Sequence, residues 1–394
     1  MQSLLKQPAP GVDAGTSWRI QWSVAILCLG LTFAALAHAQ TQVGPGSVIV
    51  STKFGGQIFG FDIDQNGSEG ILTEAQTLSN GKILAAVETF DQATGKILRV
   101  LAMTQTQDDF LTLGVVGKSV GLIEREHVVS LFNVERTFDT VNPLSGNKFT
   151  AKWTPPIDSK HLIMEASRNQ GATSNALFVF DNSGSFTPQV FSSNVAANTF
   201  SSVLNITDSA NFGSVPPPIA FNTVTNQVIL GGGPGCFNCP PVIGIADLTD
   251  STFTEFTSAG LGFINGIAVD SADGIACTTT EDDATVEFLN IASHGGFGVL
   301  LPGALGNQFF SGADVQFDPV HKLFLVAQPN SSSGSGSSIY VYDTAGNLQE
   351  TLNGFSFSNG FNVIPLHIAL NPKRRSGFVD GPDAGVTQIQ SFTY

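Results

Sequence analysis

Two residues at equivalent places of a repeated pattern are candidates for acid–base chemistry. Asp314 and His367 each stand directly before a short apolar stretch, VQFD ending at Asp318 and IALN ending at Asn371. If these stretches are neighbouring strands, the carboxylate and the imidazole approach one another, as a general base and its orienting group would. The same proximity also makes an ordinary hydrogen bond between strands. The sequence favours this structural interpretation, and the catalytic one stays open.

Asn265 is a candidate ligand-binding residue at the start of a third such stretch, NGIAVD. The equivalent places in the other repeats hold Ala313, Leu366 and Pro217. The pattern therefore favours a role for Asn265 in satisfying backbone groups at a strand start.

A second oxygen-rich segment resembles the opening of a calcium loop. Asp62, Asp64 and Asn66 alternate, and a Gly occupies the sixth place. The twelfth place, where a bidentate acid is expected, holds Thr73, and no helical pattern flanks the segment. A turn between strands accounts for the same residues. We therefore predict no cofactor, with calcium at these three residues as the weaker alternative.

The cysteines predict a local disulfide. Cys236 and Cys239 lie in the segment GGGPGCFNCPP, and Cys277 lies in a later apolar stretch. No second CxxC or nearby His completes a four-ligand zinc site. We predict a Cys236–Cys239 disulfide. A bond from either residue to Cys277, or metal or redox chemistry, remains an alternative.

The elements that position these residues repeat along the chain. Four apolar stretches end at Asn222, Asp270, Asp318 and Asn371, which are 48, 48 and 53 residues apart, and each is followed by a short turn and a second apolar strand. The chain also has 42 Gly and only 12% charged residues, which is typical of many short strands joined by tight turns. The pattern predicts an all-β fold, a β-propeller of four-stranded antiparallel blades.

Counting predicted second-and-third strand pairs favours seven blades, with six as the alternative. First strands are expected at 83–91 and 152–158 and at the four stretches above, and residues 41–47 are expected to supply a missing strand where the ring closes. The predicted pairs are 48–63, 97–116, 161–181, 228–247, 274–290, 323–343 and 377–392.

The unit NGIAVDSADGIACTTTEDDATVEFLNI resembles the YVTN and NHL families of propeller repeat. That resemblance implies that first strands line a central channel and that the loops before them, with those joining second to third strands, gather on one ligand-binding face. A weaker likeness at Asn265-Gly-Ile-Ala-Val-Asp270 to the gluconolactonase and SMP-30 propellers implies a divalent cation that activates water. It makes a lactonase-type hydrolase the alternative function.

Residues 1–39 are predicted to be a secretory signal peptide. An apolar run from Ile20 to Ala37 follows Lys6 and Arg19 and leads to a small-x-small cleavage pattern that ends at Ala39. We therefore expect a secreted or periplasmic protein whose residues 40–394 form one propeller domain, with no membrane contact after cleavage.

The remaining expectations concern partners. The formal net charge of −15 disfavours nucleic acid as a partner. The chain lacks HExxH and nucleotide-binding glycine motifs, so enzymatic activity is uncertain and the less favoured alternative. We expect a monomeric binding module for an unidentified protein, small molecule or carbohydrate, which binds through long loops on one face.

Overall fold

The computed structural model separates the chain into two units by their internal contacts, Met1–Ala39 and Gln40–Tyr394. All residues that the structure describes belong to the second unit, so the predicted signal peptide lies outside them. None of the helical structure within the described part is long and apolar enough to cross a membrane. The described residues are 40–42, 48–64, 67–106, 109–115, 121–130, 133–142, 147–153, 163–167, 174–180, 187–194, 199–206, 218–233, 239–260, 262–280, 285–301, 314–328, 337–355, 367–380 and 388–394.

Regular structure in these residues consists of β-strands and one 3-10 turn, η1 (Pro372–Arg374). Six sheets have four antiparallel strands, and one sheet has a fifth, parallel strand. The first three sheets along the chain are formed by β3 (Gln57–Ile63), β4 (Glu69–Thr77), β5 (Ile83–Asp91) and β6 (Ile97–Thr106); by β7 (Asp109–Val115), β8 (Gly121–Ser130), β9 (Asn133–Asn142) and β10 (Asn147–Trp153); and by β11 (Ile163–Ala166), β12 (Ser174–Phe180), β13 (Gln189–Asn194) and β14 (Thr199–Asn205).

The next two sheets continue the same order, and the last two also receive a strand from the start of the unit. The strands are β15 (Ile219–Asn222), β16 (Gln227–Gly231), β17 (Val242–Asp247) and β18 (Thr252–Thr257); β19 (Ile264–Asp270), β20 (Ile275–Thr280), β21 (Thr285–Asn290) and β22 (Gly295–Leu300); β23 (Val315–Asp318), β24 (Leu323–Gln328), β25 (Ser337–Asp343) and β26 (Leu348–Phe355) with β1 (Gln40–Gln42); and β27 (Ile368–Asn371), β28 (Ser376–Asp380) and β29 (Gln388–Thr393) with β2 (Ile49–Ser51).

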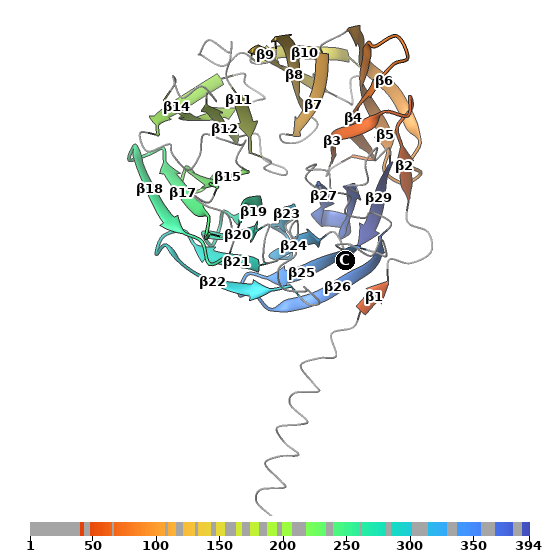
Figure 1. The fold of residues 1–394 in the computed structure, drawn as a ribbon. Helices are drawn as coiled ribbons and strands as arrows, with labels where there is room; N and C mark the ends of the chain where they lie inside the picture. Colours follow the sequence, from red (N-terminus) through yellow and green to blue (C-terminus); the bar gives the residue numbers. More distant parts are fainter. Residues whose placement is uncertain are drawn as a thin grey trace, which may run out of the picture. The chain divides into compact units, whose positions relative to one another are not determined.

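The sheets of this unit have a β-propeller-like arrangement. Within each sheet the strands pair in chain order, and the first strands of neighbouring sheets contact one another, as β15 does β19, β19 does β23, and β27 does β3. Figure 1 shows these sheets following one another about a common centre, with the first strands innermost. The prediction of an all-β fold built from repeated antiparallel sheets is confirmed.

The repeated Asp and Asn residues lie at the connections between first and second strands. The Oδ1 atoms of Asn222, Asp270 and Asp318 each accept hydrogen bonds from the backbone N–H groups two and three residues later. Four residues after each acid the backbone is left-handed, with φ of 57° at Asn226 and 66° at Gly274. These bonds close the turn, so the Asp or Asn side chain fixes where the strand ends in these three sheets.

The predicted strand pairs are correct in the last four sheets and wrong before them. Residues 83–91 form a third strand, and 152–158 begin at the end of β10, a fourth strand. The predicted pair 48–63 consists of β2 and β3, which belong to two different sheets. The predicted pair 97–116 consists of β6 and β7, which also belong to different sheets, although only residues 107–108 separate them. A gap of two residues is typical of a hairpin. The predicted pair 161–181 contains first and second strands.

The start of the unit supplies strands to two sheets. Ile49–Ser51 pairs antiparallel with β29 and becomes the fourth strand of the last sheet. Gln40–Gln42 pairs parallel with β26 of the preceding sheet. A strand that completes the last sheet was predicted, but its residues are 49–51 and not 41–47. Pairing covers the free edge of β29, whose backbone groups would otherwise be open to other chains.

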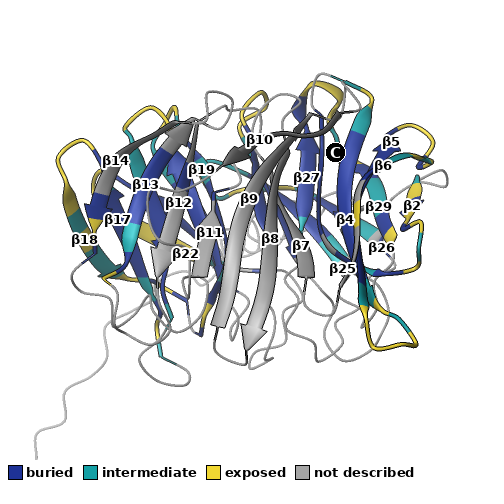
Figure 2. Ribbon diagram, turned by 90° about the horizontal axis from the view of Figure 1, so that it is seen from above, coloured by how far each residue is buried: buried dark blue, intermediate teal, exposed yellow. Residues whose placement is uncertain are grey.

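Apolar side chains fill the spaces between neighbouring sheets. One cluster joins Val50 and Phe378 of the last sheet to Phe61, Leu72 and Phe90 of the first. Figure 2 shows buried residues running along the strands and exposed residues gathered in the turns. A repeated sheet architecture is stabilised because each sheet buries its faces against the neighbouring sheets.

Candidate functional site

The starts of the first strands and the connections from second to third strands lie together. The Gly231 N–H donates to the Pro218 carbonyl oxygen, the Ala327 N–H donates to the Asp314 carbonyl oxygen over 3.0 Å, and the Gly262 N–H donates to the Cys239 carbonyl oxygen over 3.1 Å. We call this side of the unit the loop face. Its described residues include 218, 231–233, 239–241, 258–260, 262–265, 314 and 367.

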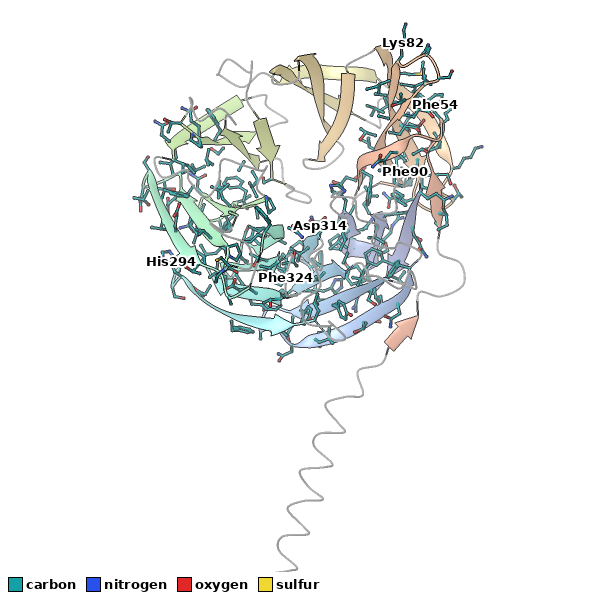
Figure 3. The ribbon with its side chains drawn as sticks, viewed as in Figure 1. Phe54, Lys82, Phe90, His294, Asp314 and Phe324 are labelled. Carbon is teal, nitrogen blue, oxygen red and sulfur yellow. The ribbon has the colours of Figure 1, made fainter. Side chains whose placement is uncertain are left out.

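Asp314 links two neighbouring sheets at the loop face. Its side chain is buried, and Oδ2 accepts a hydrogen bond of 2.9 Å from the backbone N–H of Ile368, the first residue of β27. Figure 3 places Asp314 near the common centre of the sheets, whereas His294 and Lys82 lie at the outside. A carboxylate held in this way stabilises the junction between β23 and β27.

His367 adjoins this junction. It directly precedes β27, is half-buried, and places its imidazole edge-on to the Phe61 ring, with 6.5 Å between the ring centroids. Phe61 lies on β3, so the imidazole packs between the last and the first sheet. The structure therefore brings the predicted pair to adjoining positions, with a backbone N–H next to His367 bonded to the Asp314 carboxylate.

Asn265 lies within β19 at an irregular position. The pairing of β19 with β20 shifts register between Ile264 and Gly266, which leaves Asn265 as the extra residue of a bulge. A bulge redirects the side chain that it carries. Asn265 is half-buried, on the same loop face as Asp314 and His367.

Of the predicted calcium residues, Asp62 lies in β3 and Asp64 directly follows this strand. Asp62 is buried, and its Oδ1 accepts a 2.6 Å hydrogen bond from the N–H of Ile63. The Asp64 N–H donates to the Glu69 carbonyl oxygen, and the Gln92 side chain donates to the Asp64 carbonyl oxygen. Asn66 lies outside the described residues. Within the described part of the chain, no three His, Cys, Asp or Glu side chains form a metal-binding group.

The cysteines are divided between a disulfide and a buried thiol. Cys239 is disulfide-bonded, and Cys277 is a free thiol whose pKa is raised by burial. The alternative of a disulfide to Cys277 is therefore wrong. Cys236 lies outside the described residues, so its bond to Cys239 stays a prediction. A protonated buried thiol behaves as a small apolar side chain and is a poor nucleophile.

The sequence-based search missed a pair of buried acids, Glu74 on β4 and Glu88 on β5. Both side chains are fully buried. Glu74 accepts hydrogen bonds from the N–H groups of Phe54 and Gly56, and Glu88 accepts one from the N–H of Lys53. Burial and the adjacent Glu74 carboxylate raise the pKa of Glu88 to about 7. The signal in the sequence that could have identified this pair is a Glu in the middle of each of two otherwise mainly apolar strands.

A second missed group surrounds Asp318. Its Oδ2 accepts a 2.8 Å hydrogen bond from the Tyr394 hydroxyl and lies 2.7 Å from His321 Nδ1, while Oδ1 accepts backbone N–H groups of the turn. Arg375 lies over the Tyr394 ring, 5.6 Å from its centroid. This network fastens Tyr394 to the neighbouring sheet. It lies at the end of β23 opposite the loop face.

Comparisons with known proteins support the fold alone. No protein-family model matches the chain, and no curated protein matches it. The crystal structure of Raptor from Chaetomium thermophilum is similar, with a TM-score of 0.56 and 10% sequence identity. The match covers 98% of this chain and 33% of the Raptor chain, so this chain spans about a third of that protein's length. In all, 858 chains of solved structures match, which is typical of an architecture shared by many functions.

Proposed function

We propose that the chain is an exported, seven-bladed β-propeller that binds a ligand or protein partner through its loop face. Seven sheets and the contact of β27 with β3 support seven blades arranged in a closed ring. The pairing of β2 with β29 supports closure because the start of the unit completes the last sheet. The proposal includes a monomer that uses no cofactor.

The observation that supports the binding function is an exposed aromatic ring on the connection between β18 and β19, which neighbouring residues hold in place. Phe263 is 39% exposed, and its neighbour Gly262 is bonded to the disulfide-linked Cys239. The ring also lies so close to Gly233 that a Cβ atom there would approach it to 2.8 Å. An exposed aromatic ring that its neighbours hold in place is typical of ligand contacts.

Carbohydrates are the first ligand class to test, because the apolar faces of sugar rings stack on exposed aromatic rings. We expect the purified protein to bind members of an array of defined neutral oligosaccharides. Phe263→Ser should weaken this binding at least tenfold. The matched control is Val320→Ser, because Val320 is 60% exposed but lies in the turn at the opposite end of β23. Equal affinities for both variants would contradict binding at the loop face.

A lactonase-type hydrolase is the second candidate, favoured by the adjoining positions of Asp314 and His367. The test measures hydrolysis of simple γ- and δ-lactones by wild type, His367→Ala and Asp314→Ala. We expect no turnover, and Asp314→Ala should lower the stability by about 1–3 kcal/mol because the buried Ile368 N–H loses its acceptor. Turnover that disappears in both variants while stability is unchanged would establish the hydrolase.

Export is tested by the N-terminal residue of the protein recovered from the cell envelope or medium. The compact unit starts at Gln40, the residue after the predicted cleavage site. We expect Edman sequencing or intact mass to give a chain that begins at Gln40, or at the cyclised form of that glutamine. A product that still contains residues 20–37 would contradict this part of the proposal.

A further inference from the structure

The segment from Thr52 to Gly56 joins the last sheet to the first. It follows β2, which completes the last sheet, and leads into β3, which begins the first. Any closed arrangement of the sheets depends on this segment, because it is the covalent passage between the two ends of the sheet series. What holds it in place therefore bears on the integrity of the whole unit.

Side chains of β4 and β5 hold the segment by its backbone. Glu74 Oε1 accepts a 3.0 Å hydrogen bond from the Phe54 N–H, and Glu74 Oε2 accepts a 2.7 Å bond from the Gly56 N–H. Glu88 Oε2 accepts a 3.1 Å bond from the Lys53 N–H. A Cβ atom on Gly56 would lie 2.8 Å from Glu74 Oε2, so the close approach requires glycine.

Three of the four carboxylate oxygens of Glu74 and Glu88 accept these backbone hydrogen bonds, and the fourth, Glu88 Oε1, accepts none of them. Glu88 Oε1 is fully buried and has no donor among the residues that the structure describes, although the Glu74 carboxyl lies within hydrogen-bonding reach of the Glu88 side chain. Two ionised carboxylates cannot bond to one another, and a buried acceptor without a donor is costly. One proton between the two carboxyl groups supplies the donor and removes one of the two like charges.

The surrounding charges do not neutralise the pair. Lys53 is the cation that influences Glu88, but its side chain is exposed and its ammonium lies over the Phe54 ring, 5.7 Å from the centroid. Within the four strands of the same sheet the cation is Arg99, which pairs with Glu69, whereas Lys82 and Lys96 lie in its turns. On β3, Asp62 Oδ1 accepts a hydrogen bond from the N–H of Ile63. The adjacent strand β7 contains one titratable residue, Asp109, whose side chain lies outside the described residues.

In another sheet a single acid at the equivalent position holds the corresponding connecting segment by a backbone N–H group. Glu287 stands three residues before the end of β21, as Glu88 does before the end of β5. Its Oε2 accepts the N–H of Ala259, the second residue after β18, just as Lys53 is the second after β2. Strand pairing places Thr280 of β20 where β4 has Glu74. The second acid therefore distinguishes the segment 52–56, which we call the joint, from the equivalent segment after β18.

We propose that Glu74 and Glu88 share one proton, and that loss of this proton at neutral to alkaline pH loosens the segment 52–56. The joint between the first and last sheets is then a pH-sensitive device. When both acids are ionised, two negative charges face one another in a buried site. Opening of the segment exposes them to water and relieves their repulsion. The raised pKa of Glu88, about 7, agrees with this proton position.

Hydrogen exchange of the joint tests the proposal. For a group with a pKa near 7 when closed and near 4.5 when open, protection of the Phe54 and Gly56 amides should fall about tenfold between pH 6 and pH 8, after correction for intrinsic exchange. Glu88→Gln keeps an acceptor for the Lys53 N–H but cannot ionise, so its protection should not change with pH. Glu287→Gln is the matched control and should keep the wild-type pH dependence at the joint.

Two results would overturn the proposal: protection in the wild type that is constant with pH, or an equal fall in Glu88→Gln. A direct titration covers the case in which that variant does not fold. The 13C shift of the Glu88 carboxyl carbon in selectively labelled wild-type protein should titrate near pH 7. In Glu74→Gln it should titrate at clearly lower pH, because the neighbouring charge is absent. A Glu88 carboxyl that titrates at its ordinary value in the wild type contradicts the shared proton.

Discussion

Two buried tyrosines differ in whether their hydroxyl groups have partners. The Tyr394 hydroxyl donates to Asp318 Oδ2 across the boundary between two sheets. The Tyr342 hydroxyl is buried and has no hydrogen-bond partner within the described part of the chain. A hydroxyl of the first kind stabilises the fold, whereas one of the second kind has been removed from water with nothing to replace it.

We therefore expect opposite effects from the same chemical change. Tyr394→Phe should lower the free energy of unfolding by about 1 kcal/mol or somewhat more, because the acceptor is a carboxylate. Tyr342→Phe should be neutral or slightly stabilising. Urea unfolding of the two variants beside the wild type measures this difference. A stability loss in Tyr342→Phe that equals the loss in Tyr394→Phe would mean that the partnered hydroxyl has no special role.

Residue chemistry could be predicted from sequence only where a local rule applied. Asp270 and Asp318 lie in turns whose bonds run two and three residues along the chain, so their role follows from spacing alone. The bond from Ile368 to Asp314 and the pairing of Glu74 with Glu88 join different strands. Their partners are determined by sheet packing, which the sequence of a single chain does not display.

At the scale of elements, the same distinction explains which strands were predicted correctly. In the last four sheets an Asp or Asn turn marks the end of each first strand, and the predicted strands agree with the structure. In the first sheet β4 and β5 are nine residues long, so the strand spacing of the last four sheets does not apply there. The strands β2 and β3 look like a hairpin because a short Gly-containing segment joins them, yet β2 pairs with β29 near the other end of the chain.

That long-range pairing makes a prediction about β2. Val50 is fully buried in the cluster between the last and first sheets, whereas its neighbour Ile49 is 42% exposed. Val50→Ala should cost about 1.5–3 kcal/mol through lost burial and a residual cavity. Ile49→Ala is the matched control and should cost less than about 1 kcal/mol. Thermal unfolding gives both values. Equal effects would argue that β2 contributes pairing but no packing to the last sheet.

For the whole molecule, the joint at residues 52–56 connects the chemistry of one acid pair to global stability. The carboxyl of Glu88 has a pKa of about 7 in the folded chain, against 4.5 for an ordinary Glu. Because folding favours the protonated form, its contribution is fully present below about pH 4.5 and is lost as the pH rises through 7. The change is on the order of 3 kcal/mol. Asp91 behaves oppositely, since its pKa is lowered by Thr94 and its contribution disappears only in acid.

We therefore expect the free energy of unfolding to fall between pH 5 and pH 8 in the wild type and in Glu287→Gln, and to change less in Glu88→Gln. Urea unfolding at each pH, at one ionic strength, measures the slope. Comparison with hydrogen exchange then locates the motion. If the amides of Phe54 and Gly56 lose protection at pH 8 while amides in β16 and β24 keep theirs, the joint opens by itself. If all of them change in parallel, the acid pair acts through unfolding of the entire unit, and the local device that we propose is wrong.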